Sequence, residues 1–184
     1  MPASGVKTRY VGFVRNVMIG REGLHRPVLV EIFRAAGAAE PRSYISTGNI
    51  SFSAQDKDVS DMTGTVEDRI AEVIGRHEPV FVRSVDYLRD LVASDPFATS
   101  PVSDPVDRTV SFTRDPLGDI ELPVWSRRAD VALFRATERE VFAVGRLVDG
   151  RTSGGGGLVE KTIGQPVTTR SWNTVLRIVA DPGL

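Results

Sequence analysis

Residues 168–174, TTRSWNT, place an arginine, an asparagine and four hydroxyl side chains around a tryptophan near the end of the chain. A guanidinium just before a helix adds its charge to the N–H groups and the positive dipole end of the first turn, and this combination favours an anion. Arg170, Asn173 and Thr174 are therefore candidate ligands for a small anionic or polar molecule. An arginine that pairs with a carboxylate from elsewhere in the chain is an equally good interpretation.

Three polar residues in the first half of the chain are further candidates. Arg15 and Asn16 follow the apolar run RYVGFV, and Asn49 belongs to a turn with Thr47 and Gly48. In compact α+β folds, strand ends and helix starts let polar side chains converge without burying unpaired backbone groups. We expect these side chains and Arg170 to meet at one cleft between the two halves of the chain.

The glycine-rich segment SGGGGLVEK, residues 153–161, follows Arg151. Glycines before a helix can aim backbone N–H groups at an anion, so Arg151 is also a candidate ligand. The spacing GxxxxGK[ST] of a phosphate-binding loop is absent, and four consecutive glycines are more typical of a flexible connection. Both interpretations of this loop stay open.

Residues suited to catalysis or metal binding are sparse. The chain has no cysteine, and its two histidines, His25 and His77, have no partners at metal-ligand spacing. It also lacks the GxSxG and HExxH motifs of two large hydrolase classes. We predict no metal and no cofactor, and assign neither histidine a role.

The charge balance and the hydropathy pattern exclude several classes of protein. With 23 basic and 24 acidic side chains the net charge is −1, so nucleic acid is a disfavoured partner unless a local basic patch exists. No run of about 18 apolar residues occurs, and the first residues carry charge where a signal peptide needs apolar side chains. We expect a cytoplasmic protein with no membrane contact.

Hydrophobic periodicity predicts the elements that position the first group of candidates. The order is strand, helix, two strands joined by the turn at Gly48, helix and strand, with one further helix that begins after Ser84 as its N-cap. This β-α-β-β-α-β order is typical of a ferredoxin-like fold. The elements are expected at residues 9–14, 27–36, 42–46, 50–53, 66–74, 79–83 and 85–92.

The second half predicts a smaller α+β unit. Strands are expected at residues 108–113, 130–136 and 140–145, followed by a short helix at 158–163 and a terminal helix that buries Trp172. Thr168, Thr169 or Ser171 would supply the N-cap of that helix. The proline-rich residues 96–107 read as a connection, so the predicted units are 1–95 and 108–184, packed together.

Three sequence blocks resemble the domain-of-unknown-function 1697 family of uncharacterised bacterial proteins. RYVGFVRNVMIG, SYISTGNISF and VEKTIGQPVTTRSWNTVLRIV are similar to its LLRGINVGG, YIQSGNVVF and TTRNWNTV patterns. The resemblance implies two packed α+β units and no established activity. Its characteristic positions correspond to Arg15, Gly20, Gly48, Asn49, Arg170, Trp172, Asn173 and Thr174.

The chain departs from this family pattern at two places. Asn16, Val17 and Met18 stand where the family has Gly-Ile-Asn, which alters the first loop. Ser153 stands at the lysine of the family's Gly-Arg-Ser-Lys-Leu segment, so a role that needs this lysine is not supported here. Arg151 of the same segment is retained.

Three functions fit these residues, and the first is preferred. It is a non-catalytic protein that binds a small anionic or polar ligand between its two units. The second is an enzyme that acts on a small phosphorylated or carboxylated metabolite through its arginines, although no general base is evident. RNA binding through the sheet is less favoured, because RYVGFVRN lacks the basic and aromatic pattern of RNA-binding strands.

Overall fold

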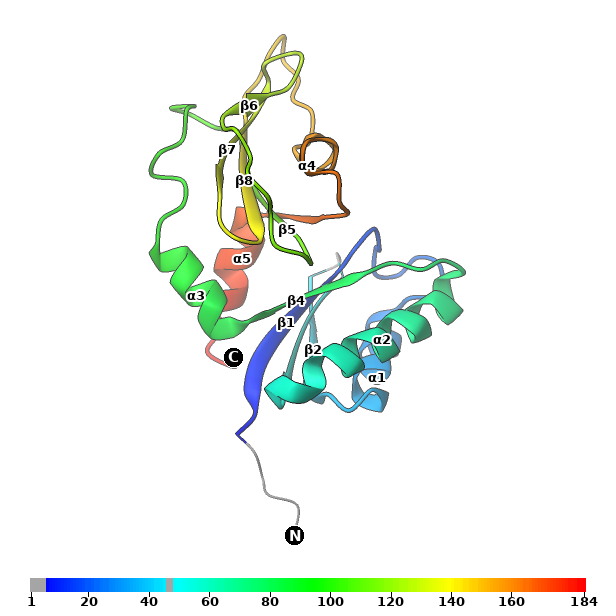
Figure 1. Cartoon of the computed structure of the whole chain (residues 1–184). Helices are drawn as coiled ribbons and strands as arrows, with labels where there is room; N and C mark the ends of the chain where they lie inside the picture. Colours follow the sequence, from blue (N-terminus) through cyan, green and yellow to red (C-terminus); the bar gives the residue numbers. More distant parts are fainter. Residues whose placement is uncertain (1–5, 46–47) are drawn as a thin grey trace. The chain divides into compact units, whose positions relative to one another are not determined.

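The computed structural model describes residues 6–45 and 48–184, which divide into two compact units (Figure 1). The first unit runs to Arg89 and includes Pro182–Leu184, and the second is Asp90–Asp181. Each unit combines helices with an antiparallel sheet, which confirms the predicted α+β class. The division falls inside a helix, Val85–Ala93 (α3), and not within residues 96–107.

The first unit contains a four-stranded antiparallel sheet in the order β2-β3-β1-β4. The predicted order of strands and helices is found, with one 3₁₀ turn added before α2. The elements are β1 (Thr8–Val14), α1 (Arg26–Ala35), β2 (Ala39–Tyr44), β3 (Asn49–Ala54), η1 (Asp56–Asp58), α2 (Val59–Ile74) and β4 (Val80–Ser84).

Local signals explain where these helices begin and end. Proline occupies the first turn of α1, where its missing N–H costs nothing. Gly75 ends α2 with a φ of 74°, a conformation that glycine adopts without steric cost. The Ser84 hydroxyl accepts a hydrogen bond from the N–H of Tyr87 at 3.1 Å, which confirms Ser84 as the predicted N-cap of α3.

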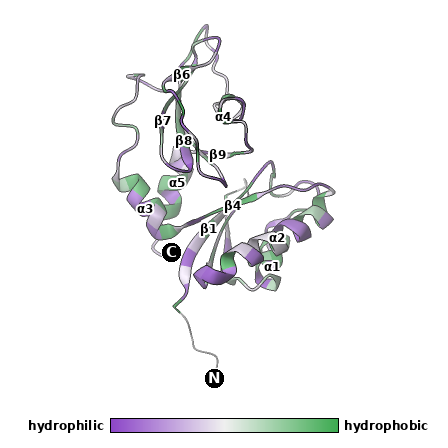
Figure 2. Cartoon of the chain, viewed as in Figure 1, coloured by the Kyte–Doolittle hydropathy of each residue, from purple (hydrophilic) through white to green (hydrophobic). Residues whose placement is uncertain are grey.

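The two helices α1 and α2 pack against one face of this sheet (Figure 1). Their hydrophobic and hydrophilic residues alternate in bands along each helix, as amphipathic helices require (Figure 2). Phe33 of α1 lies 5.3 Å from Phe52 of β3, measured between ring centroids, and both are fully buried. Burial of these apolar side chains therefore holds the helices on the sheet.

The second unit contains a five-stranded antiparallel sheet in the order β6-β7-β8-β5-β9. The three predicted strands are confirmed, and the sheet adds two that the sequence did not indicate, β6 and β9. The elements are β5 (Asp107–Phe112), β6 (Val124–Trp125), β7 (Val131–Ala136), β8 (Glu140–Gly145), α4 (Gly156–Ile163), β9 (Thr168–Ser171) and α5 (Trp172–Val179).

Helices α4 and α5 lie on opposite faces of this sheet. Ala143 of β8 belongs to the apolar cluster that includes Val159 of α4. The next side chain along the strand, Phe142, contacts Trp172 of α5 at 5.9 Å between ring centroids. Because successive side chains of a strand point to opposite faces, the two helices cover different faces.

One expectation about the second unit is wrong. Thr168, Thr169 or Ser171 was expected to cap the terminal helix, but residues 168–171 form β9, and the side chain of Ser171 makes no capping hydrogen bond. In the predicted connection, residues 96–107, Phe97 is buried within this unit. Its ring lies 5.2 Å from that of Trp172 and 5.7 Å from that of Phe142.

Candidate functional site

Arg15 follows the end of β1 and forms an ion pair inside the first unit. One of its guanidinium nitrogens donates to Glu78 Oε2 at 3.1 Å, and the two side chains are 24% and 7% exposed. The Asn16 amide nitrogen lies 3.4 Å from both oxygens of the same carboxylate, and Arg76 Nε donates to Glu78 Oε1 at 3.1 Å. Glu78 therefore brings two predicted candidates, Arg15 and Asn16, together.

The charges of this cluster are balanced. Arg76 also pairs with Glu22 at 2.5 Å, and this hydrogen-bonded partner, followed by Glu78, raises the pKa of Arg76 above its usual range. The same contact lowers the pKa of Glu22. The cluster thus contains two guanidinium groups and two carboxylates. Its ion pairs stabilise the loop after β1, and its charges cancel, so it attracts an anion only weakly.

We expect Arg15→Ala to lower the free energy of unfolding by about 1–3 kcal/mol, because the nearly buried Glu78 carboxylate loses a charged donor. Urea unfolding of the variant and the parent measures the difference. Arg42→Ala is the matched control, since Arg42 is exposed and its side chain has no hydrogen bond or ion pair within residues 6–45 and 48–184. Equal losses at the two positions would mean that the ion pair does not stabilise the fold.

Asn49 lies at the hairpin between β2 and β3 and is fully buried. Its amide nitrogen donates to the carbonyl of Tyr44 at 3.2 Å, which closes the hairpin. The neighbouring Gly48 accepts a hydrogen bond from the N–H of Val14 at 2.8 Å, so the end of β1 and this turn are in contact. Thr47 of the predicted turn and Ser46 of the predicted strand before it lie outside the described part of the chain.

Arg170 lies in β9, and only 8% of its surface is exposed. One guanidinium nitrogen donates to Thr168 Oγ1 at 2.8 Å and to the carbonyl of Thr169 at 2.9 Å. Burial lowers the pKa of Arg170 to about 10. Loss of hydration therefore disfavours the cation, and an anion beside it would offset this penalty.

Asn173 and Thr174 occupy the first turn of α5, directly after β9. Asn173 is exposed and Thr174 is half-buried. Their backbone N–H groups belong to the set that a helix leaves without an intrahelical acceptor. The Arg170 guanidinium is held by Thr168 and Thr169 of β9, the strand that leads directly into this turn.

The loop that holds Arg151 and Ser153 is fixed by a buried aspartate that sequence reasoning missed. Asp130 Oδ1 accepts a hydrogen bond from Ser126 Oγ at 2.6 Å, and Oδ2 accepts from the N–H and the hydroxyl of Ser153, both at 2.7 Å. These hydrogen bonds, from Ser126 first and then Ser153, hold the pKa of Asp130 well below its usual range. Ser153 thus has a structural role.

Two of the four consecutive glycines lie very close to the sheet. A Cβ at Gly155 would lie 3.1 Å from that of Ala143, and one at Gly156 would lie 2.8 Å from Thr169 Oγ1. The start of α4 therefore lies directly against the sheet. Glycine here allows close contact with strands, an interpretation that the sequence analysis did not weigh.

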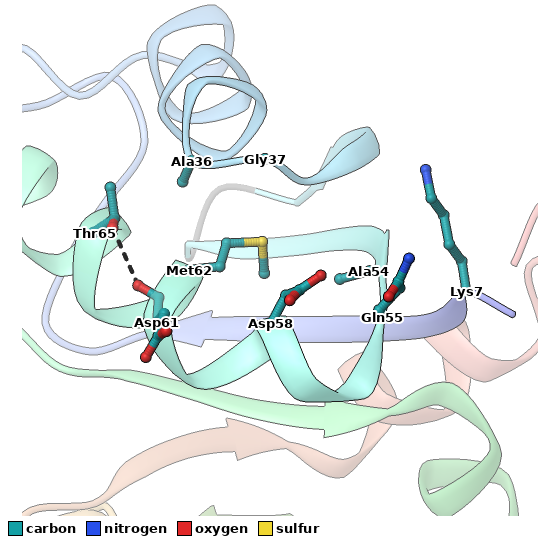
Figure 3. A pocket seen from close by; sticks show the side chains of 9 residues that line it. All are labelled: Lys7, Ala36, Gly37, Ala54, Gln55, Asp58, Asp61, Met62 and Thr65. Atoms are coloured by element: carbon teal, nitrogen blue, oxygen red, sulfur yellow. Dashed lines mark hydrogen bonds between the residues drawn. The ribbon is translucent and has the colours of Figure 1, made fainter. Parts of the chain in front are cut away.

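A shallow pocket of about 340 Å³ lies in the first unit, between the end of α1 and the start of α2 (Figure 3). Lys7 lines one part of it, and the exposed carboxylates of Asp58 and Asp61 line another. The Thr65 hydroxyl donates to the Asp61 carbonyl at 3.1 Å, a bond within α2. None of the predicted ligand residues reaches this pocket, whose carboxylates are those of a solvated helix start.

The seven predicted ligand residues divide between the two units. Arg15, Asn16 and Asn49 belong to the first, and Arg151, Arg170, Asn173 and Thr174 belong to the second. A cleft that both groups share stays a prediction. Among residues 6–45 and 48–184, no group of three or more His, Asp or Glu side chains could hold a metal ion, and no helix is long and apolar enough to cross a membrane.

Two α+β units, each built on an antiparallel sheet, define the class of this protein. Its fold is similar to the structure of the conserved bacterial protein SP0830 from Streptococcus pneumoniae, with a TM-score of 0.64 and 16% identity over 95% of this chain and 97% of that one. No curated protein matches the sequence. Residues 7–142 match the family described as "Protein of unknown function (DUF1697)", and the chain belongs to this family.

The family match confirms the resemblance seen in the first two sequence blocks. It ends at residue 142, so the TTRSWNTV block lies outside the matched residues. The role of Arg170, Asn173 and Thr174 therefore has to be argued from their own geometry.

Proposed function

We propose that this protein binds a small anionic metabolite, with Arg170 of β9 as the cationic centre and the first turn of α5 as a second group of donors. A phosphate or carboxylate is the chemical class that a guanidinium and backbone N–H groups recognise together. We also propose a cytoplasmic location, which the cysteine-free sequence supports.

The burial of Arg170 is the observation that carries the proposal. A guanidinium that is 8% exposed has lost most of its hydration, and this loss lowers its pKa to about 10. Its hydrogen bonds to the Thr168 hydroxyl and the Thr169 carbonyl hold the guanidinium in place. An anion that contacts a buried guanidinium is attracted strongly, because little water screens the charge, so binding energy is available at this position.

The first turn of α5 supports the same class of ligand. Ser171 leaves the helix without a side-chain cap, and the exposed amide of Asn173 adds a donor beside the turn. The balanced Arg15–Glu78 cluster of the first unit offers no comparable charge. We therefore place the main binding energy in the second unit.

A thermal-shift screen with phosphate, sulfate, citrate, sugar phosphates and nucleoside monophosphates tests the proposal. We expect at least one anion to raise the melting temperature, because a ligand that binds only the folded state stabilises it. Arg170→Gln should reduce the affinity for that anion by about 1.5–3 kcal/mol, the usual contribution of a charge-assisted hydrogen bond. Titration calorimetry measures the loss.

Two variants of α5 distinguish binding at the proposed site from a general effect of charge. Asn173→Ala changes an exposed side chain and should weaken binding with little effect on unfolding. Arg177→Ala removes an exposed positive charge near the other end of the same helix and should leave the affinity unchanged. Equal losses in Arg177→Ala and Arg170→Gln would show a general charge effect, which contradicts the proposed site.

A further inference from the structure

Four arginines gather on two neighbouring loops at one end of the second unit, in a chain whose net charge is −1. The loops are residues 126–130, between β6 and β7, and residues 146–153, after β8 (Figure 1). Their exposed basic side chains are Arg127, Arg128, Arg146 and Arg151. Within these two loops, which are described in full, Asp149 is the one exposed acidic side chain.

Hydrogen bonds hold the two loops together. The N–H of Arg146 donates to the carbonyl of Asp130 at 2.8 Å, and its Nε donates to that of Ala129 at 2.7 Å. A guanidinium nitrogen of Arg128 donates to the carbonyl of Val148 at 2.9 Å. These acceptors are neutral carbonyls, so the two arginines are fixed in place while their positive charge is kept.

A tight turn fixes the position of Arg151. Asp149 and Gly150 have φ of 51° and 70°, and Val148 and Arg151 exchange backbone hydrogen bonds of 2.9 and 3.1 Å across them. Two positive φ angles at the centre of a two-residue turn are typical of a type I′ hairpin. The side chains of Arg127 and Arg151 form no hydrogen bond or ion pair with the described residues, so both are available to a partner.

An aromatic ring borders this basic surface. Trp125 of the edge strand β6 is 36% exposed, and the Arg146 guanidinium carbon lies 5.1 Å from its ring centroid. A cation over an indole ring is a favourable contact that also holds the ring in one orientation. Its remaining exposed surface is available for stacking.

We propose that these two loops, with Trp125, form a binding surface for single-stranded nucleic acid. Arginines follow the phosphate backbone and an exposed aromatic ring stacks on a base, the combination that single-strand binding proteins use. The surface does not include Arg170, and all of its residues belong to the second unit. It is a local basic patch, which the net charge of −1 for the whole chain does not reveal.

The turn at the tip favours nucleic acid over an anionic membrane. A loop that inserts into lipid presents apolar side chains at its tip. Here the tip is Asp149 and Gly150, and the carboxylate would oppose insertion. The exposed apolar Leu147 precedes the turn and is not at its tip.

Fluorescence anisotropy with a labelled oligouridylate of about ten nucleotides, at about 50 mM salt, tests this inference on the full chain. We expect Arg127→Ala/Arg151→Ala to weaken binding about tenfold or more. The slope of log affinity against log salt should fall by about 1.4, since each phosphate contact to a single strand contributes about 0.7. Arg34→Ala/Arg69→Ala is the matched control, because it removes two exposed arginines from the first unit.

Tryptophan fluorescence gives an independent readout. The oligonucleotide should quench the emission of Trp125, and Trp125→Phe should abolish the quenching because Trp172 is buried. Arg170→Gln should leave both signals unchanged, which separates this inference from the proposed anion site. Equal affinities of the two double variants would overturn the inference. So would binding to phosphatidylserine vesicles without binding to the oligonucleotide, or no binding to either.

Discussion

Trp172→Ala is expected to lower the free energy of unfolding by about 3–5 kcal/mol, the usual cost of removing a large buried aromatic side chain. Trp172 is 6% exposed at the start of α5, and its ring packs against those of Phe97 and Phe142. Its removal would leave a cavity where α5, β8 and the segment before β5 meet. Guanidinium unfolding, followed by circular dichroism, measures the loss.

Trp125→Ala is the control for this effect. Trp125 is 36% exposed on a two-residue edge strand and contacts the Arg146 guanidinium. We expect a loss of about 1 kcal/mol or less, since little apolar area leaves the core. Similar losses at the two tryptophans would contradict the assignment of Trp172 to the core of the second unit.

Gly48→Val is expected to cost about 2–5 kcal/mol, from backbone strain and steric overlap together. Gly48 has a φ of 68°, which a β-branched residue adopts only with strain. A Cβ at this position would lie 2.5 Å from Val17 Cγ2 and 3.2 Å from the carbonyl oxygen of Val14. The Val17 methyl group can turn away, but the Val14 carbonyl belongs to the backbone of β1, which pairs with β4 at this residue.

Alanine variants at two glycines separate strain from overlap. Gly20 has a φ of 94°, and a Cβ there would meet no atom within 4 Å. Gly20→Ala therefore measures strain alone, about 1–2 kcal/mol. We expect Gly48→Ala to cost more in the same urea titration. If the two alanine variants unfold alike, close packing around the hairpin turn does not constrain Gly48.

The elements of the first unit were predictable because their signals are local. Pro27 marks the start of α1, Gly75 the end of α2, and Ser84 the cap of α3, and each of these acts within one turn of its own position. Strand β1 is rich in apolar residues that lie in the core, and β3 contributes the buried Ile50 and Phe52. Short-range chemistry was therefore sufficient for the order of the elements and for most of their ends. The start of α2 was missed, because the helix begins at Val59 and not at the predicted Val66.

Strand β9 was missed because a distant partner stabilises it. Its sequence, TTRS, has no apolar alternation, and its hydroxyl groups are equally suited to capping a helix. The strand is formed by pairing with β5, where Thr169 Oγ1 lies 2.7 Å from Ser111 Oγ, 58 residues earlier in the chain. The β-branched threonines were the available signal.

The contacts of the candidate residues were also missed, because their partners are distant in the sequence. Residue type and spacing brought Arg15 and Asn16 to attention, but their shared partner, Glu78, lies more than 60 residues away and has no local signature. Asp130, which fixes the loop of Ser153, read as an ordinary strand-end acid. A sequence shows which polar residues are candidates. It does not show which distant residues the fold brings into contact with them.

Arginine-detected NMR of a phosphate or carboxylate titration tests the central claim most directly. The Arg170 Nε–H resonance can be assigned by its loss in Arg170→Lys. The proposed function predicts that this resonance shifts and saturates with the anion that raises the melting temperature. The claim is contradicted if this resonance does not move while the anion stabilises the protein, or if only exposed arginines such as Arg127 and Arg151 respond.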